Sequence, residues 1–189
     1  ALLSNQNFRQ ALNYGFDRSA TVNAVNPGYK AYNRLVDSNF AGPGGGKFVD
    51  EYPVETAPLS GDVDQAKEYL AAAMEELGYS DVSQLPQLEL ITWDTSEQKL
   101  LLKTIIDQWK QNLGLENIQL TQYVIGTAIG SFYDLSYDLF SITWETDVLP
   151  TDIMEAMVTG GEVNYGIWSD AQFDALVEQA INELDPDKQ

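Results

Sequence analysis

The fold of this chain is decided by residues 88–124, LELITWDTSEQKLLLKTIIDQWKQNLGLENIQLTQYV. Leu88–Trp93 and Ile118–Val124 have the short, apolar and β-branched composition of strands. The interval between them carries apolar residues at helical spacing, with a threonine and a serine that can cap its start and Gly114 at its end. Strand, helix and strand in this order form a βαβ unit. The pattern therefore predicts an α/β fold with parallel strands and a right-handed crossover.

Helical and strand patterns continue on both sides of this unit. Asp17 and Asp62 stand where N-caps belong, Gly78 stands where a C-cap glycine belongs, and Ser169-Asp-Ala-Gln172 has the form of a capping box. The sequence therefore predicts one domain spanning residues 1–189, without repeats. Its further helices are expected near residues 4–16, 17–25, 62–77, 152–159 and 169–184, and a further buried strand is expected at Tyr137–Trp144.

Residues 26–60 show neither periodicity and are predicted to be an irregular excursion within the domain. They contain Gly42-Pro-Gly-Gly-Gly-Lys47, which invites comparison with a phosphate-binding loop. That loop requires a glycine where this chain has Ala41, and a serine or threonine where it has Phe48. We therefore expect a flexible loop without a phosphate site.

Acidic residues dominate the charge of the chain. It has 29 Asp and Glu against 10 Lys and Arg, a formal net charge of −19. A nucleic-acid backbone or an anionic membrane surface is bound through clustered cations, so both functions are disfavoured. High solubility is the simplest meaning of this charge, and long-range attraction of cationic ligands is a second one.

The chain contains neither cysteine nor histidine. Thiol chemistry is therefore excluded, and the commonest general base and metal ligand is missing. The acidic pairs also lack the spacing of a calcium loop. We expect no metal, no cofactor and no enzymatic activity. A hydrolase that uses carboxylates is the alternative from another class, and it lacks the support of a G-x-S-x-G motif.

Two tryptophans, Trp93 and Trp144, stand at the carboxyl ends of predicted strands, just before polar turns. Ligands of open α/β sheets bind at this edge. Both indoles are therefore candidates for ligand contact, whereas Trp109 lies on the inward face of its helix and is expected in the core.

Several segments, taken in order, resemble the second lobe of the peptide-binding proteins of ABC transporters, extracellular solute-binding protein family 5. The chain opens with Asn7-Phe-Arg-Gln-Ala-Leu-Asn-Tyr-Gly-Phe-Asp-Arg18, which is similar to the start of that lobe. The order and spacing of the later segments match as well. They are Leu77-Gly-Tyr79, Thr95-Ser96, Trp109-Lys-Gln-Asn-Leu-Gly114, Tyr137-Asp-Leu, Trp144 with Asp147, Asn164-Tyr-Gly-Ile-Trp-Ser169 and Phe173-Asp-Ala-Leu-Val177.

This resemblance implies a lobe of the type II periplasmic-binding-protein architecture, a mixed sheet flanked by helices. Residues 1–189 would be one lobe, the C-terminal one, of a two-lobed monomeric protein that holds short peptides in the cleft between its lobes. Its partners would be the permease and ATPase subunits of a membrane importer. Its place would be extracytoplasmic, either periplasmic or as a cell-surface lipoprotein whose anchor lies outside this fragment.

The resemblance also implies site residues. Asp147 matches the aspartate that takes the N-terminal ammonium of the peptide, and Trp144 matches the tryptophan of the cleft. A partly desolvated carboxylate suits an ammonium group, since the hydrogen bond is charge-assisted. Asn164 and Tyr165 lie where the family approaches the cleft again, and Trp93 completes the set of candidate ligand-binding residues.

The chain departs from the family pattern after Asp147, where Val148 replaces a tyrosine and Pro150 comes one residue early. Fold alone does not decide the ligand. A binding protein of the same fold for a nickel chelate, a sugar or an opine, or a sensory module, therefore remains an alternative.

Overall fold

A computed structural model describes residues 2–143 and 150–185, which form two compact units. The first unit contains Ala1–Asn33 and Thr56–Ile142, and the second contains Arg34–Glu55 and Thr143–Gln189. The described elements of the first unit are α1 (Gln6–Tyr14), α2 (Arg18–Val25), α4 (Val63–Leu77), the 3₁₀ turn η1 (Val82–Gln84), β1 (Leu88–Trp93), α5 (Ser96–Leu113), β2 (Ile118–Tyr123), α6 (Ile125–Asp134) and β3 (Leu139–Phe140). Those of the second unit are α3 (Phe48–Glu51), α7 (Pro150–Ala156) and α8 (Ala171–Asn182).

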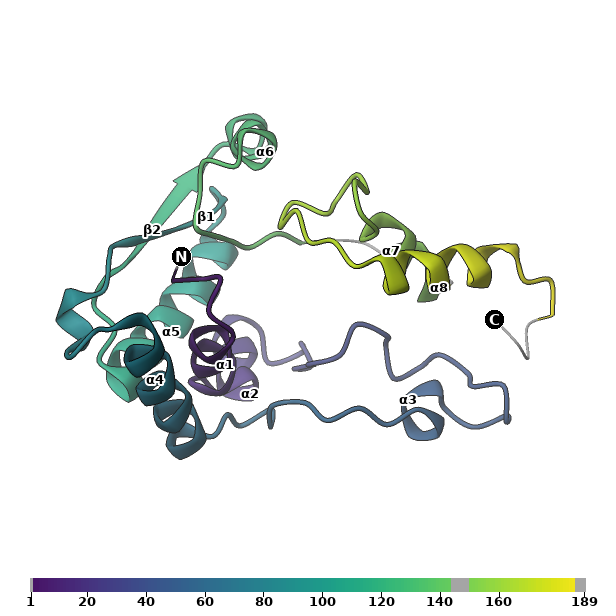
Figure 1. Cartoon of the computed structure of the whole chain (residues 1–189), viewed down its shortest axis with the longest axis horizontal. Helices are drawn as coiled ribbons and strands as arrows, with labels where there is room; N and C mark the ends of the chain where they lie inside the picture. The colour runs from purple at the N-terminus through teal and green to yellow at the C-terminus, as the bar shows by residue number, and fades with distance from the viewer. Residues whose placement is uncertain (1, 144–149, 186–189) are drawn as a thin grey trace. The chain divides into compact units, whose positions relative to one another are not determined.

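The predicted βαβ unit is confirmed in the first unit, where β1, α5 and β2 follow one another (Figure 1). The three described strands lie in the order β2-β1-β3, and both pairings are parallel. The register runs from Leu88 opposite Ile118 to Trp93 opposite Tyr123. Parallel pairing brings the carboxyl ends of the strands to one edge of the sheet, and this places Trp93 at that edge.

Helices pack on the two faces of this sheet. Leu88 and Leu90 alternate with Ile91 along β1, so they point to opposite faces. The two leucines join one apolar core with buried side chains of α1, α4 and α5, among them Phe8 and Trp109. The helix α6 contacts β1 and β2 and lies on the opposite side of the strands from α1, α4 and α5 (Figure 1). The first unit is therefore a sheet between two helical layers.

In the first unit, α1, α2, α4 and α5 begin where the sequence offers a side-chain acceptor. Asn5, Asp17, Asp62 and Thr95 each accept a hydrogen bond from a backbone amide in the first turn of their helix. These bonds satisfy amide groups that have no partner within the helix. At the end of α4, Gly78 adopts φ +77°, a conformation that costs other residues energy. The caps predicted for α2, α4 and α5 are confirmed.

Three local predictions are corrected. The strand expected at Tyr137–Trp144 is shorter among the described residues, Leu139–Phe140, and its side chains are half-buried instead of buried. The cap of α8 is Asp170 and not Ser169, because the Asp170 carboxylate accepts from two amides, those of Gln172 and Phe173. The helix expected at 152–159 is Pro150–Ala156, and its end tightens into a bond from the Met157 amide to the Met154 carbonyl.

The short helix α3, in the stretch expected to be irregular, was not predicted from the sequence, and neither was the longer helix α6. It contains Gly126 and Gly130 and several β-branched residues, which have weak helix propensity. Its N-cap, Val124, makes no side-chain capping bond. The helix forms because Ala128 and Phe132 are buried, at 0% and 2% exposure, in a unit where β1 and β2 supply the contacts. Tertiary packing has here overridden local propensity.

Candidate functional site

The carboxyl end of β1 leads into a turn that is held by hydrogen bonds. The amide of Asp94 donates to the carbonyl of Tyr123 at 2.8 Å, and the amide of Thr95 donates to the carbonyl of Trp93 at 2.9 Å. The side-chain amide of Gln122 donates to the carbonyls of Trp93 and Thr95, at 3.4 and 3.2 Å. The end of β2 thus fixes the turn that follows β1, and this turn presents its residues at the edge where ligands of parallel sheets bind.

Trp93 lies at this edge, as the sequence predicted, and its indole carries an unused donor. The residue is half-buried, and its Nε1 is buried without a hydrogen-bond partner in the described part of the chain. The hydroxyl of Thr121 is also buried and unpaired. Thr121 lies opposite Ile91, two register steps before Trp93, and so stands on the same face of the sheet. Buried polar atoms of native proteins usually have a partner, so these two mark a place where a further acceptor is chemically favoured.

A cluster of polar side chains lies beneath the same edge, and the sequence reasoning missed it. The hydroxyl of Thr92 donates to the carbonyl of Ser141 at 2.9 Å. The side-chain oxygen of Gln98 lies 3.5 Å from the Thr92 hydroxyl and 3.4 Å from the Ser141 hydroxyl. Thr92 is fully buried and Gln98 is 9% exposed. The cluster joins β1, α5 and the end of β3, so it fixes the point at which the chain leaves the sheet.

One sequence signal could have found this cluster: Thr92 is a polar residue inside an otherwise apolar strand, and such a residue needs a buried partner. The identity of the partners depends on the pairing of β1 with β3. That pairing joins residues 49 positions apart, and no local pattern reports it.

The other described candidates, Asn164 and Tyr165, belong to the second unit. The Asn164 amide nitrogen donates to the carbonyls of Val158 and Trp168, at 3.0 and 2.7 Å, and its oxygen accepts from the Trp168 amide at 3.0 Å. Asn164 is 7% exposed. Its polar atoms are therefore committed to the turn before α8, and the geometry favours a role in positioning its neighbours. Tyr165 is half-buried.

The two remaining candidates, Trp144 and Asp147, lie outside the described residues. The described chain nevertheless shows how their segment begins. The Ser141 amide donates to the Ile91 carbonyl at 3.1 Å, which extends the pairing of β3 with β1 as far as the carboxyl edge. The position of Asp147 as an ammonium partner stays a prediction.

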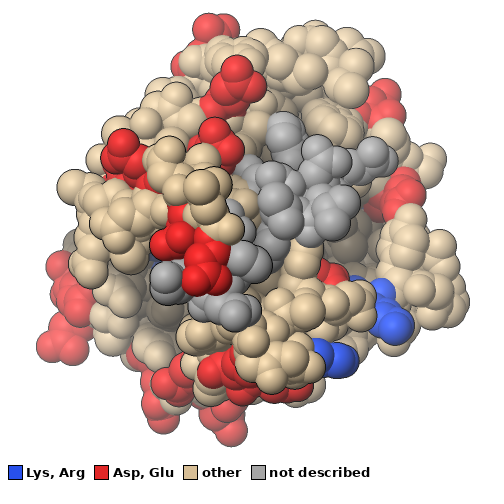
Figure 2. Space-filling view, turned by 90° about the vertical axis from the view of Figure 1, so that its right-hand side faces the viewer, with Lys and Arg blue, Asp and Glu red and all other residues tan. Residues whose placement is uncertain are grey.

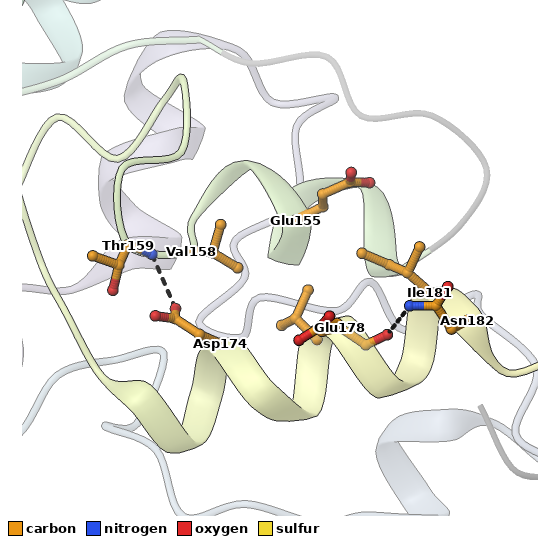
Figure 3. A pocket seen from close by; sticks show the side chains of 8 residues that line it. Glu155, Val158, Thr159, Asp174, Glu178, Ile181 and Asn182 are labelled. Atoms are coloured by element: carbon orange, nitrogen blue, oxygen red, sulfur yellow. Dashed lines mark hydrogen bonds between the residues drawn. The ribbon is translucent and has the colours of Figure 1, made fainter.

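Two surface hollows lie away from these candidates. One, of about 310 Å³, lies between α7 and α8, with the carboxylates of Glu155, Asp174 and Glu178 around apolar side chains (Figure 3). Hydrogen bonds from the side chain and the backbone of Thr159 lower the pKa of Asp174. The other hollow, of about 490 Å³, lies in the first unit against α4 and η1. Neither hollow is lined by a candidate residue.

Acidic side chains are spread over the face displayed in Figure 2, with few basic ones among them. Among the described residues, no group of three or more carboxylates has the arrangement of a metal site. In the same part of the chain, no helix is long and apolar enough to cross a bilayer.

Comparison with known proteins agrees with this architecture. Residues 1–165 match the profile of the bacterial extracellular solute-binding proteins, family 5, middle region. The oligopeptide-binding protein OppA of Bacillus subtilis is 28% identical over 98% of this chain, and the dipeptide-binding protein DppE of the same organism is 25% identical over 96%. The chain spans about a third of the length of these relatives, 33% and 32%.

Solved structures share the fold. OppA of Listeria monocytogenes, solved bound to peptide, superposes with a TM-score of 0.80 at 23% identity and covers 94% of this chain and 34% of its own. The murein tripeptide binding protein MppA of Escherichia coli gives a TM-score of 0.78 at 20% identity and covers 100% of this chain and 35% of its own. The predicted fold, a lobe of the type II periplasmic-binding-protein kind, is confirmed. With a profile that matches most of its length, this chain belongs to family 5 of the bacterial extracellular solute-binding proteins.

Proposed function

We propose that this chain is one lobe of a protein that captures short peptides and delivers them to an ABC importer. The observation that carries the proposal is the match of residues 1–165 to family 5, supported by relatives whose names state oligopeptide and dipeptide binding. A chain that spans a third of its relatives corresponds to part of such a protein. The peptide would lie in a cleft that this lobe shares with another, and closure of the lobes would hold it.

In this proposal the protein binds and releases its ligand without chemistry. The absence of histidine and cysteine from the chain supports a binding role over a catalytic one. The partners would be the permease and ATPase subunits of the importer, and the protein would act as a monomer. The family description as extracellular supports a place outside the cytoplasm, with a lipid anchor as one means of retention.

Asp147 is proposed as the partner of the peptide ammonium group, with Trp144 beside it. The carboxyl edge supports this assignment, because β3 ends there shortly before Trp144 in the sequence. We propose Trp93 as a further ligand contact. Its unpaired Nε1 would donate to a peptide carbonyl, which supplies the acceptor that the described residues do not.

Isothermal calorimetry on the full-length protein tests this function. Wild type should bind a tripeptide with a free amino terminus, and Asp147→Asn should weaken that binding on the order of 10–100-fold, because a charge-assisted hydrogen bond contributes about 1.5–3 kcal/mol. The N-acetylated tripeptide should lose far less. The matched control is Asp64→Asn, an exposed aspartate in the first turn of α4.

Equal losses for the free and the acetylated peptide would remove Asp147 from the proposed role. Mass spectrometry of the ligand that co-purifies with the full-length protein tests the ligand class separately. A sugar, an opine or a metal chelate in place of peptides would overturn peptide capture.

A further inference from the structure

The glycine-rich loop at residues 42–47 is closed by its own backbone. The amide of Gly42 donates to the carbonyl of Gly46 at 2.9 Å, and the amide of Gly45 donates to the carbonyl of Gly42 at 3.0 Å. Ala41 and Lys47 form an isolated antiparallel bridge at the base. These bonds leave the amides of Gly44 and Gly46 directed away from the loop carbonyls and available to another acceptor.

That acceptor is the carboxylate of Glu51, the last residue of α3. The amide of Gly44 donates to Oε2 at 2.8 Å and the amide of Gly46 donates to Oε1 at 2.7 Å. Each carboxylate oxygen is thus bound by a different backbone amide, at distances typical of charge-assisted hydrogen bonds. Convergent backbone amides of this kind form an anion-binding nest, and here the anion belongs to the chain itself.

The Glu51 carboxylate also lies close to the backbone of three glycines of this loop. A Cβ at Gly44 would lie 3.0 Å from both carboxylate oxygens, and a Cβ at Gly46 would lie 2.9 Å from Oε1. A Cβ at Gly42 would meet the same carboxylate still more closely. Of the glycines in this loop, Gly45 alone has a positive φ, +84°. At the other three positions the Glu51 carboxylate lies where a side chain would begin, so any larger residue there would have to displace it.

Glu51 is itself held in place by its helix and by an arginine. The guanidinium of Arg34 donates to the carbonyl of Val49 at 3.0 Å and reaches the carbonyl of Val54 at 3.4 Å. The rings of Phe48 and Tyr52 pack with centroids 5.0 Å apart. These contacts fix the short helix α3 within residues 34–55, so the carboxylate reaches the loop from an anchored base.

We propose that Gly42–Lys47 is a carboxylate-binding loop whose resident ligand is Glu51, and that this ligation fixes the loop. The loop looks from its sequence like a flexible connector or a phosphate site. The Glu51 carboxylate orders this glycine-rich loop, which would otherwise be flexible. The carboxylate also occupies the amides of Gly44 and Gly46 that an external phosphate would need.

The test is ¹⁵N relaxation of the loop amides in the full-length protein that contains this chain. In wild type the amides of Gly42 and residues 44–47 should have order parameters near 0.85, the value of rigid backbone, and in Glu51→Ala and Glu51→Gln they should fall below about 0.6. Glutamine preserves the shape of the side chain but presents a donor to one of the two amides. Glu55→Gln is the control, since Glu55 is an exposed glutamate of the same segment and its substitution changes the charge equally.

A second kind of variant should loosen the loop without changing Glu51. Gly44→Ala keeps the charge of Glu51 but places a methyl group against both carboxylate oxygens, so it should loosen the loop as Glu51→Gln does. The proposal is overturned if the loop stays rigid in the Glu51 variants, if Glu55→Gln loosens it equally, or if Gly44→Ala leaves it rigid. It is also overturned if only Gly44 and Gly46 become mobile while Gly42 and Gly45 remain ordered.

Discussion

The two compact units of this chain are stabilised in different ways. In the first unit, buried apolar side chains of α1, α4, α5 and the sheet form one continuous core. In the second unit, Val36 and Val177 are the buried apolar residues among those described, and polar side chains bind the backbone instead. Glu51 binds two glycine amides, Arg34 binds two carbonyls, and Asn164 holds a turn by three hydrogen bonds.

This difference shows that one sequence can specify structure by two means. In an apolar core many side chains share the burial, so exchanges that keep the volume are tolerated, whereas a truncation that leaves a cavity is costly. A backbone held by side-chain hydrogen bonds depends on a few residues, each of which satisfies groups that nothing else reaches. The predictions below test whether the two units respond to substitution as this contrast requires.

The largest effect is expected in the core of the first unit. Leu102 is 4% exposed and Leu100 is 45% exposed, and both lie on α5. Leu102→Ala should lower the free energy of unfolding by about 2–5 kcal/mol, since it removes apolar contacts and leaves a cavity. Leu100→Ala should change it by no more than about 0.5 kcal/mol. Urea denaturation followed by circular dichroism measures both, and equal losses would contradict the assigned core.

A smaller but substantial loss is expected from a single polar residue of the second unit. Asn164→Ala removes the partner of three backbone groups around a 7%-exposed side chain, and each buried group left unsatisfied costs about 1–3 kcal/mol. Asn182→Ala is the control, because Asn182 is exposed and makes one hydrogen bond, to the Glu178 carbonyl. Amide exchange of residues 158–168 measures the effect. Similar exchange in the two variants would refute the positioning role of Asn164.

The helix caps should behave alike in both units. Asp62→Ala at α4 and Asp170→Ala at α8 should each cost about 0.5–2 kcal/mol, because each leaves first-turn amides without an acceptor. Ser169→Ala should cost less than Asp170→Ala, since Ser169 is not the cap. Amide exchange in the first turn of each helix reports the loss. A larger effect for Ser169→Ala would restore the capping box that the sequence suggested.

The smallest effect concerns acid titration. Hydrogen bonds from Ser83 lower the pKa of Asp81 in the first unit, as those from Thr159 lower the pKa of Asp174 in the second. The stabilisation from each carboxylate is therefore complete above its unfolded pKa, about 3.9, and is lost as the pH falls through the lower folded value. Carboxyl ¹³C titration should place both midpoints below about 3.9. Thr159→Val should move only that of Asp174 upward, and no movement would refute the assigned cause.

The same contrast explains how much of the fold could be predicted. The βαβ unit and the caps of α2, α4 and α5 follow from the spacing of apolar residues and from local polar residues. Both are visible in the sequence itself. The helix α6 does not, because its glycines and uncapped start argue against a helix until β1 and β2 bury Phe132. The carboxylate of Glu51 in the glycine loop could not be foreseen either, since side-chain reach across a turn leaves no periodic signal.

For the candidate site, the sequence predicted which edge of the sheet carries Trp93, but it did not predict the side-chain contacts at that edge. Trp93 was placed at the carboxyl end of β1 because strand ends are marked by polar turns. The Thr92, Gln98 and Ser141 cluster depends on the register between β1 and β3, which is a property of the folded sheet. Asn164 was a candidate because of its position in the family pattern. Its hydrogen bonds to the backbone of Val158 and Trp168 depend on the folded turn, so the sequence did not predict them.

The central place of β1 in the order β2-β1-β3 has a consequence for biosynthesis. The carbonyl of Glu89 is bound by the Asp138 amide, and the Glu89 amide donates to the Asp138 carboxylate, 49 residues further along the chain. At translation rates of about 5–20 residues per second, that side of the nascent strand waits roughly 2–10 seconds for its neighbour. During this interval Leu90 and Ile91 belong to an unprotected apolar edge, the kind of template that recruits other chains. A chaperone that shields residues 88–93 would have its greatest effect in this window.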